Sequence, residues 1–522
     1  MLAILTISLY LLIPAFMLGL KLWKPRFPYF WLVAALANLV VWPLILFLWL
    51  RIPEVIPLTT WSPRSDTTTP LELLLDPFSW SFGLALATIN LAIVLTDVTR
   101  PTERNWSAWA GGMALTGLGI LAVFSGNPLT LLLAWQAIDL VEVVALLSQG
   151  FYARDREPVV GIFGARIAGS ILVMAAILIA ASQGQSLTFE NLTPAITVLL
   201  IVGAGLRLGT LPFYAPLFQN LPSQQGLFTL FRLVPAASSL ILLARAAQVG
   251  VPANAVPWFL GLLGLLGIYS SLAWLTAADE VAGRPFWILG MASLAMASAV
   301  LARSSASLAW GMALLLPGSM LFLASTRTRR LLFLPAIGLI SLSCLPYTPT
   351  WAGLQLYSTP FHPLVILLLF AQAFLWIGYA RHSLRMTRLE TGIERWAWTL
   401  YILGLVLPLV IFFIASYWNG TLLEGPNLTQ NWPLLVIYSL AGAAYFIQRR
   451  GVHLRFPQPF GSFLRNLASL TWVLFSVTWI YSVLRRTTAF ISLILEGEGG
   501  VLWSILLLVL LLTVIAGASF GR

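Results

Sequence analysis

Long apolar runs recur along the chain from Met1 to Ser519, and only short polar loops separate them. A run of roughly 20 apolar residues can cross a bilayer as a helix, because a helix bonds all of its own backbone groups. Short alternating strands, which are typical of outer-membrane barrels, are absent from the sequence. The pattern therefore predicts an all-α polytopic membrane protein with about sixteen transmembrane helices. Their expected centres lie near residues 11, 39, 87, 116, 138, 170, 201, 237, 266, 294, 316, 338, 369, 406, 441 and 509.

The charged residues support this topology. They make up only 9% of the chain and fall mainly in the expected loops. With both termini outside, 21 Lys and Arg residues lie on inner segments and five on outer ones. This is the positive-inside pattern, so the net charge of +11 does not indicate nucleic-acid binding. We expect an integral protein of a bacterial inner membrane, in contact with the lipid bilayer, with both termini periplasmic.

The C-terminal part follows a different pattern. Leu467–Leu484 is apolar enough to span, but Arg465 precedes it and Arg485 and Arg486 follow it, so both ends favour the inside. A lateral amphipathic helix along the cytoplasmic interface satisfies both ends. From about Gly461 to Leu495 it would run roughly 50 Å at the helical rise. A final anchor helix would follow. The alternative is an ordinary seventeenth span.

Two spans are interrupted by proline pairs, Pro212 with Pro216 and Pro346 with Pro349. The pairs lie in the seventh and twelfth expected spans. Each span reverses the direction of the chain, and five is an odd number, so two repeat units of five helices would have opposite orientation in the membrane. Paired broken helices in inverted repeats indicate an ion path near the bilayer midplane. The alternative is two ordinary proline kinks. The repeat interpretation divides the chain into N-terminal helices (1–105), a first inverted repeat (106–250), a second inverted repeat (251–380), additional helices (381–455), the lateral helix (456–499) and the anchor helix (500–522).

Several motifs resemble one known family. Gly126–Gln136, Arg207–Phe213, Ser238–Arg245, Leu342–Gly353 and Leu75–Ser79 are similar, in this order and spacing, to segments of one family of antiporter-like membrane subunits. These are the proton-conducting subunits of respiratory complex I (NADH-quinone oxidoreductase), of Mrp-type antiporters and of energy-converting hydrogenases. The expected C-terminal lateral helix also resembles the brace of the longest members. The resemblance implies two inverted five-helix repeats and a role in proton or cation translocation.

The chain departs from that family at titratable positions. The resemblance implies a glutamate at position 136 and a lysine at position 207, but the sequence has Gln136 and Arg207. Lys21 and Lys24 are the only lysines in the chain. Arginine stays protonated even when it is buried. Arg207 is therefore expected to fix a charge without passing protons itself.

The fifth span offers residues for an altered proton relay, one that does not depend on the missing glutamate and lysine. Gln136, Asp139 and Glu142 are spaced by three residues and so share one helix face. Ionisable groups at this depth are functional by default, and two carboxylates can share a proton. The alternative is structural: Arg166 and Arg207 neutralise the two acids and lock the helices together.

Other charged residues are secondary candidates for the ion path. Asp76 also suits a helix cap, and Asp279, Glu280 and Arg284 also suit a solvated loop. Arg232 lies within the eighth expected span. Cys344 is the only cysteine, and no motif for catalysis, a metal or a cofactor is recognised.

The leading hypothesis is an antiporter-like subunit of a complex-I-like or energy-converting-hydrogenase-like assembly, either conducting through an altered relay or acting as a degenerate structural remnant. Its partners would be other membrane subunits, including other antiporter-like subunits, and any redox chemistry would occur in those partners. Two alternatives stay open. One is a membrane subunit of a stand-alone cation/proton antiporter or inorganic-carbon uptake system. The other is a non-conducting scaffold.

Overall fold

The computed structural model describes residues 1–59, 70–99, 106–148, 156–184, 186–210, 225–324, 331–385, 394–426 and 431–449, with isolated positions between 479 and 509. The chain divides into two compact units, Met1–Gln458 and Pro459–Arg522. All the elements discussed below belong to the first unit. They are α1 (Leu2–Trp23), α2 (Phe30–Phe47), η1 (Leu48–Arg51), β1 (Glu54–Pro57), β2 (Glu72–Leu75), α3 (Pro77–Thr96), η2 (Asp97–Thr99), α4 (Trp106–Val123), α5 (Pro128–Ser148), α6 (Arg156–Ser182), α7 (Pro194–Leu208), α8 (Gln225–Ala246), α9 (Val256–Thr276), α10 (Glu280–Val300), α11 (Ser304–Leu323), α12 (Phe333–Ser341), η7 (Trp351–Tyr357), α13 (Val365–Ser383), α14 (Arg395–Trp418) and α15 (Trp432–Arg449).

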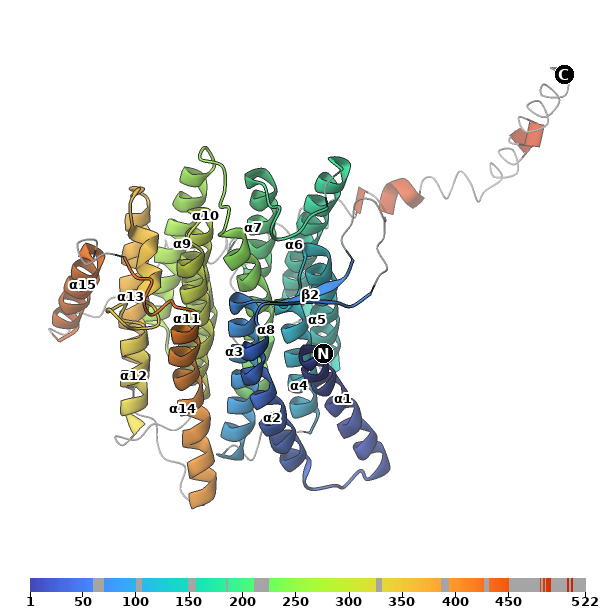
Figure 1. Cartoon of the computed structure of the whole chain (residues 1–522), viewed down its shortest axis with the longest axis horizontal. Helices are drawn as coiled ribbons and strands as arrows, with labels where there is room; N and C mark the ends of the chain where they lie inside the picture. The colour runs from blue at the N-terminus through green and yellow to red at the C-terminus, as the bar shows by residue number, and fades with distance from the viewer. Residues whose placement is uncertain are drawn as a thin grey trace. The chain divides into compact units, whose positions relative to one another are not determined.

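The helices follow the apolar pattern of the sequence. Each of the first fifteen expected centres lies within one of α1–α15, and these helices run side by side (Figure 1). Within the described part of the chain, eleven helices are long and apolar enough to cross a membrane. The predicted helical membrane fold is confirmed. The sixteenth centre, near residue 509, falls where only isolated positions are described.

Three helices form the core of the first unit. α3, α8 and α11 contact one another. Their most apolar stretches are buried to 94%, 94% and 100%, respectively, whereas those of α1 and α2 are buried to only 28%. A helix that is apolar on all sides can be buried completely, as α3, α8 and α11 are, or can face lipid on one side, which suits α1 and α2. The central three helices therefore hold the bundle together, while α1 and α2 lie at its edge.

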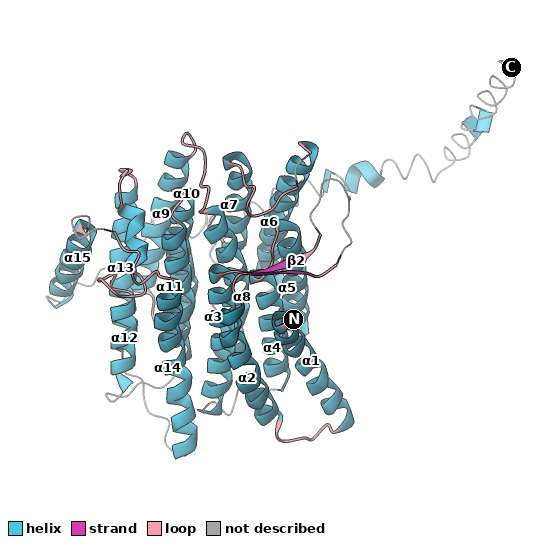
Figure 2. Cartoon of the chain, viewed as in Figure 1, coloured by secondary structure: helices cyan, strands magenta, loops and turns pink. Residues whose placement is uncertain are grey.

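Within the described ranges, a small two-stranded sheet departs from the predicted all-α class. β1 pairs antiparallel with β2, with Glu54 opposite Leu75, and β2 is the magenta element in Figure 2. β2 also continues toward the α4–α5 loop, where the Gly126 amide donates to the Glu72 carbonyl at 2.9 Å. Strands of four residues are too short to give a clear alternating pattern, so the sequence did not predict them.

The two predicted helix breaks are described to different extents. α7 ends at Leu208, and Gly209 follows with a left-handed φ of 79°. Pro212 and Pro216 lie outside the described residues. α12 ends at Ser341, and Pro346 and Pro349 lie in the non-helical stretch between α12 and η7. The inverted relation of the repeats, the domain boundaries and the lateral helix stay predictions, and most of the lateral helix falls outside the described positions.

A glycine contact brings α6 and α7 unusually close together. A Cβ on Gly169 would lie 2.6 Å from the Gly203 carbonyl oxygen, and one on Gly203 would lie 2.9 Å from the Gly169 carbonyl oxygen. Only glycine allows the two backbones this separation, and small residues serve this purpose in membrane helix packing. The same Cβ on Gly169 would lie 3.0 Å from Arg207 Cγ. The contact therefore also sets the position of Arg207.

We predict that Gly169→Val lowers the free energy of unfolding by about 1–3 kcal/mol, because the added methyl groups force α6 and α7 apart. Gly164→Val is the matched control on the same helix, since a Cβ there meets nothing within 4 Å. Both variants carry the same change in helix propensity. Thermal unfolding in detergent measures the difference, and equal effects of the two variants would contradict the close contact.

Candidate functional site

Four charged side chains from three helices meet inside the first unit. Asp139 and Glu142 come from α5, Arg166 from α6 and Arg207 from α7, and all four are buried. Asp139, Glu142 and Arg166 lie well inside long apolar helices, and Arg207 lies in the last turn of α7. The structure brings together the four charged residues that the sequence singles out as main candidates, and we call them the charge cluster.

Asp139 and Arg207 form the best-defined pair of the charge cluster. Arg207 Nη1 donates to Asp139 Oδ2 at 2.7 Å, and Arg207 Nη2 donates to Asp139 Oδ1 at 3.0 Å. The guanidinium also lies over the Trp135 ring, 4.3 Å from its centroid. A two-pronged pair of this kind fixes both side chains, because the planar guanidinium matches the carboxylate. Asp139 is therefore held in place by a cation that keeps its proton.

Arg166 bridges the two acids. Its Nη1 donates to Asp139 Oδ1 at 3.3 Å and also donates to Glu142 Oε2. The second carboxylate oxygen of Glu142, Oε1, is buried and has no hydrogen-bond partner among the described atoms. Asp139 thus uses both of its oxygens, while Glu142 uses one. The two acids differ in how firmly they are held.

A polar side chain that the sequence did not indicate links the cluster to the edge of the bundle. Ser170 accepts from Gln136 Nε2 at 2.8 Å and from Arg207 Nη1 at 3.4 Å. It lies one turn after Arg166 on α6, and that i, i+4 spacing is the signal that could have found it. Gln136 itself is exposed on the surface of the chain. Its amide therefore connects the buried charges with the outside of α5.

The pairing differs from the one that the family resemblance implies. There the acid stands at position 136 and the cation at position 207. Here Arg207 pairs with Asp139, which lies three residues further along the same face of α5. The cluster has two cations and two acids, so it is neutral. Unpaired charges inside a membrane are costly, and neutrality removes most of that cost.

Among the secondary candidates, Asp76 caps a helix. Its carboxylate accepts from the Ser79 amide at 2.7 Å, while Ser79 Oγ accepts from the Asp76 amide at 2.8 Å. Asp76 Oδ2 also lies 3.6 Å from Nη2 of the buried Arg245. This reciprocal capping box is the structural alternative named from the sequence.

The acid–base group at the start of α10 is not a solvated loop. Asp279 caps the helix by accepting from the Ala282 amide at 2.7 Å. Glu280 and Arg284 lie in the first turns of α10, and both are buried. The solvated-loop interpretation is therefore wrong for these two residues, because the helix begins earlier than the charge pattern suggested. Arg232 on α8 lies within electrostatic range of Arg284, Arg166 and Glu142.

The second helix break is held by neutral polar groups. Gln372 Nε2 donates to Cys344 Sγ at 3.1 Å, and Tyr357 Oη donates to Gln372 Oε1 at 2.6 Å. Thr350 Oγ1 accepts from the Cys344 amide at 3.1 Å and donates to the Ser341 carbonyl at 2.8 Å. The two Thr350 contacts bond backbone groups that the end of α12 leaves free, and the other two link side chains. The sequence analysis noted the prolines but missed this network, whose members are separated along the chain.

Across the described ranges, no group of three or more His, Cys, Asp and Glu side chains is placed to hold a metal ion. The four residues of the charge cluster can move a charge or hold it in place. The fixed cations are Arg166 and Arg207, and the acid with an unbonded oxygen is Glu142.

The fold is that of known membrane-complex subunits. No protein-family model and no curated protein matches the chain. Among solved structures, a chain of the Mrp complex from Dietzia sp. DQ12-45-1b matches at a TM-score of 0.69 and 16% identity, covering 99% of this chain and 63% of that one. A chain of the membrane-bound sulfane sulfur reductase, an archaeal respiratory membrane complex, matches at a TM-score of 0.63 and 15% identity, covering 83% of this chain and 99% of that one.

These matches place the chain in a structural class. It shares the polytopic helical fold of these two membrane-complex chains, and the sequence motifs implied a fold of this kind. It spans slightly less than two thirds of the Mrp-complex chain that it matches. At this identity the likeness extends to the fold and not to the activity.

A double-variant cycle tests the pairing inside the charge cluster. We predict that Arg207→Gln lowers the free energy of unfolding by roughly 3–5 kcal/mol, because it leaves a buried carboxylate without its main partner. Combining it with Asp139→Asn removes both charges and should recover part of that loss. Thermal unfolding in detergent gives the four values of the cycle. Strictly additive losses would show that the two side chains do not interact.

Proposed function

We propose that this antiporter-like subunit translocates protons or cations in a multi-subunit membrane complex, with Glu142 as the group of the charge cluster that gains and loses the proton. The observation that carries the proposal is the inequality of the two acids. Asp139 is held on both oxygens, whereas Glu142 has one oxygen that makes no hydrogen bond with any described residue. A relay needs such a group, because arginines do not titrate at working pH.

Arg166 supplies the response to protonation. It already donates to both acids, at 3.3 Å to Asp139 Oδ1 and also to Glu142. When Glu142 takes up a proton it becomes neutral, and its attraction for Arg166 falls. Asp139 then retains Arg166 together with Arg207, and the cluster carries one net positive charge. Return to neutrality favours release of the proton from Glu142. In this way the fixed cations make the protonation of one acid reversible.

The exposed amide of Gln136 supports a partner subunit against α5. Its neighbours on the surface of α5 and α6 are apolar, and they include Leu133, Leu140, Ile167 and Ile171. A polar amide facing hydrocarbon is unfavourable, so a covering protein surface would stabilise it. We propose that another membrane subunit, of antiporter-like or other type, covers this face. The proposal places the complex in a bacterial inner membrane, with both termini of this chain periplasmic.

The test is proton flux through the purified complex in liposomes. A potassium diffusion potential drives proton entry, and a trapped pH-sensitive dye records it. We predict that Glu142→Gln lowers flux to the level of protein-free vesicles, while the control Glu190→Gln leaves it unchanged, because Glu190 is exposed and lies in the loop before α7. Copurification of the same partners shows that the assembly is intact. Unchanged flux in Glu142→Gln, and in the double variant with Asp139→Asn, would rule out these acids.

A second function is favoured by the neutrality of the cluster. Two acids and two arginines in mutual contact can lock α5, α6 and α7 together without conducting anything. This non-conducting scaffold, a structural remnant of a conducting subunit, predicts unchanged flux when Glu142 is neutralised. It also predicts that the assembly dissociates when residues 457–522 are deleted.

The kind of assembly is a separate question. Copurification in mild detergent followed by mass spectrometry distinguishes the candidates. Subunits with iron–sulfur clusters, nickel–iron centres or quinone sites would place the chain in a complex-I-like or energy-converting-hydrogenase-like assembly. Antiporter partners alone, or a soluble partner of carbon-hydrating type, would instead support a stand-alone antiporter or an inorganic-carbon uptake system.

A further inference from the structure

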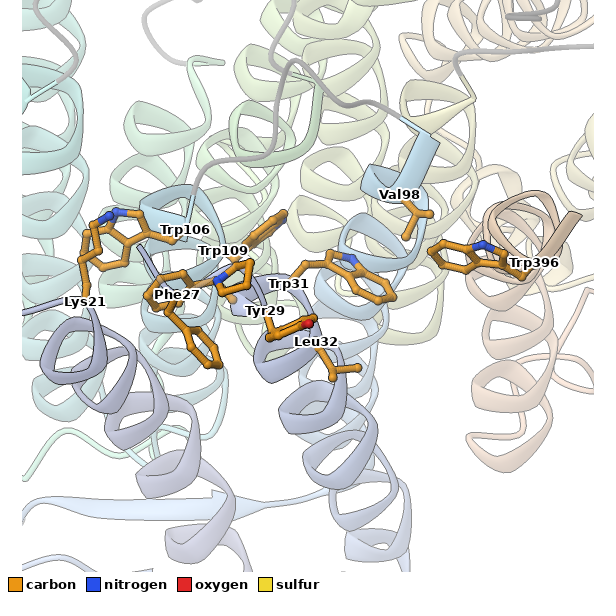
Figure 3. A pocket seen from close by; sticks show the side chains of 11 residues that line it. Lys21, Phe27, Tyr29, Trp31, Leu32, Val98, Trp106, Trp109 and Trp396 are labelled. Atoms are coloured by element: carbon orange, nitrogen blue, oxygen red, sulfur yellow. The ribbon is translucent and has the colours of Figure 1, made fainter. Parts of the chain in front are cut away.

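A cavity lies apart from the charge cluster, where the ends of several helices meet. Its volume is about 390 Å³, and it is lined by Lys21 and by seven aromatic rings, among them Trp31, Trp106, Trp109 and Trp396. Figure 3 shows Lys21 and Trp396 at opposite sides of the cavity, with the other three tryptophans between them. We call it the aromatic cavity.

The helix ends that surround the aromatic cavity indicate its depth in the membrane. It is formed by the C-terminal end of α1, the end of η2 after α3, and the N-terminal ends of α2, α4 and α14. Helix ends that meet on one face of a membrane bundle lie where hydrocarbon gives way to headgroups. Tryptophan is enriched at that level. This is also the face that the positive-inside pattern predicts to be cytoplasmic.

The aromatic rings offer apolar faces rather than hydrogen bonds. Trp31 Nε1 donates to the Val94 carbonyl at 2.9 Å, and Trp109 Nε1 donates to Asp97 Oδ2 at 3.0 Å. Trp396 Nε1 donates to Glu394. Because these donors are already used, an occupant meets ring carbon at Trp31, Trp109 and Trp396. The occupant is therefore expected to have an apolar body.

The polar contacts come from cations. Lys21 alone is charged among the described residues that line the cavity. It donates to the Pro25 carbonyl at 2.5 Å, and an ammonium has two further donors. Lys24 follows directly after α1, and its Nζ lies 5.1 Å from the centroid of the Trp23 ring. Two described acids bond to lining residues: Asp97, which is only 4% exposed, accepts from Trp109, and Glu394 accepts from Trp396. Both lysines of the chain therefore lie at this end of α1, Lys21 in the lining of the cavity and Lys24 three residues further on.

The start of α2 adds to the positive potential. In the described structure, Tyr29 at the start of α2 makes no side-chain cap bond, so the first amides of α2 keep donors without a partner. The dipole of α2 therefore favours an anion there and acts in the same direction as the two lysines. The start of α14 does not contribute, because Glu394 places a carboxylate at that position.

We propose that the aromatic cavity binds one anionic phospholipid. The phosphate lies between Lys21 and Lys24, and the glycerol and upper chain carbons lie against the tryptophan rings. The cavity is too small for a whole phospholipid, so the chains continue into the bilayer. Basic pockets between helices on the cytoplasmic side recognise anionic headgroups in this way. The proposal is independent of proton conduction, since it shares no residue with the charge cluster.

Native mass spectrometry of the whole purified chain tests the proposal. After detergent exchange, phosphatidylglycerol or phosphatidylcholine with the same acyl chains is added, and the retained lipid is counted. We expect one tightly held phosphatidylglycerol and no comparable phosphatidylcholine. Lys21→Gln with Lys24→Gln should weaken retention roughly 30-fold, since each basic residue near an anionic headgroup contributes roughly fivefold.

Two further variants make the outcome specific. Lys21→Arg with Lys24→Arg keeps both charges and should keep most of the retention. Arg51→Gln with Arg303→Gln removes two charges elsewhere, with Arg51 beyond the opposite end of α2, and should leave retention unchanged. Equal retention of the two lipids, or full retention after loss of both lysines, would overturn the proposal. Displacement of the lipid by free glycerol phosphate would show that the headgroup alone is recognised, which would overturn the role of the rings.

Discussion

The cost of placing charge inside a bilayer governs this structure. Asp139, Glu142, Arg166 and Arg207 lie among apolar helices and are buried, where an isolated charge is strongly unfavourable. They are tolerated because they neutralise one another through direct contacts. Removal of any one of them leaves an uncompensated charge, so the four act as a unit.

The surrounding fold follows from the need to bring these four groups together. Gly169 and Gly203 let α6 and α7 approach closely enough for Arg207 to reach α5. The break after α7 leaves Arg207 in the last turn of a short helix, and Trp135 covers its guanidinium. At the end of α12, Thr350 bonds free backbone groups, and Gln372 bonds the Cys344 thiol, so the polar contacts there are made without any charge. The ends of α7 and α12 are therefore chemically unequal, and among the described residues the charge cluster lies at the end of α7 and not at that of α12.

Much of this could be predicted from the sequence, because hydrophobic length and charge position are local properties. The helix centres and the shared face of Asp139 and Glu142 follow from spacing alone. The contacts between helices do not. Ser170 gave only a weak local signal, and Gln372 is far in sequence from Cys344, so their roles depend on tertiary packing. Glu280 and Arg284 were misjudged because charged residues beside a predicted loop suggest solvent, whereas α10 begins at Glu280 and buries both. Strands β1 and β2 were missed because they are only four residues long.

The central claim is that one carboxylate titrates within a group of otherwise fixed charges. Infrared difference spectroscopy of the purified chain in bilayers, recorded between neutral and acidic pH, tests it most directly, because a protonated carboxylic acid has its own carbonyl band. The account predicts a buried carboxylic-acid band on acidification that disappears in Glu142→Gln and persists in Glu190→Gln. A spectrum in which no buried carboxylate titrates, or a band unaffected by Glu142→Gln, would contradict it and leave the cluster as a structural lock.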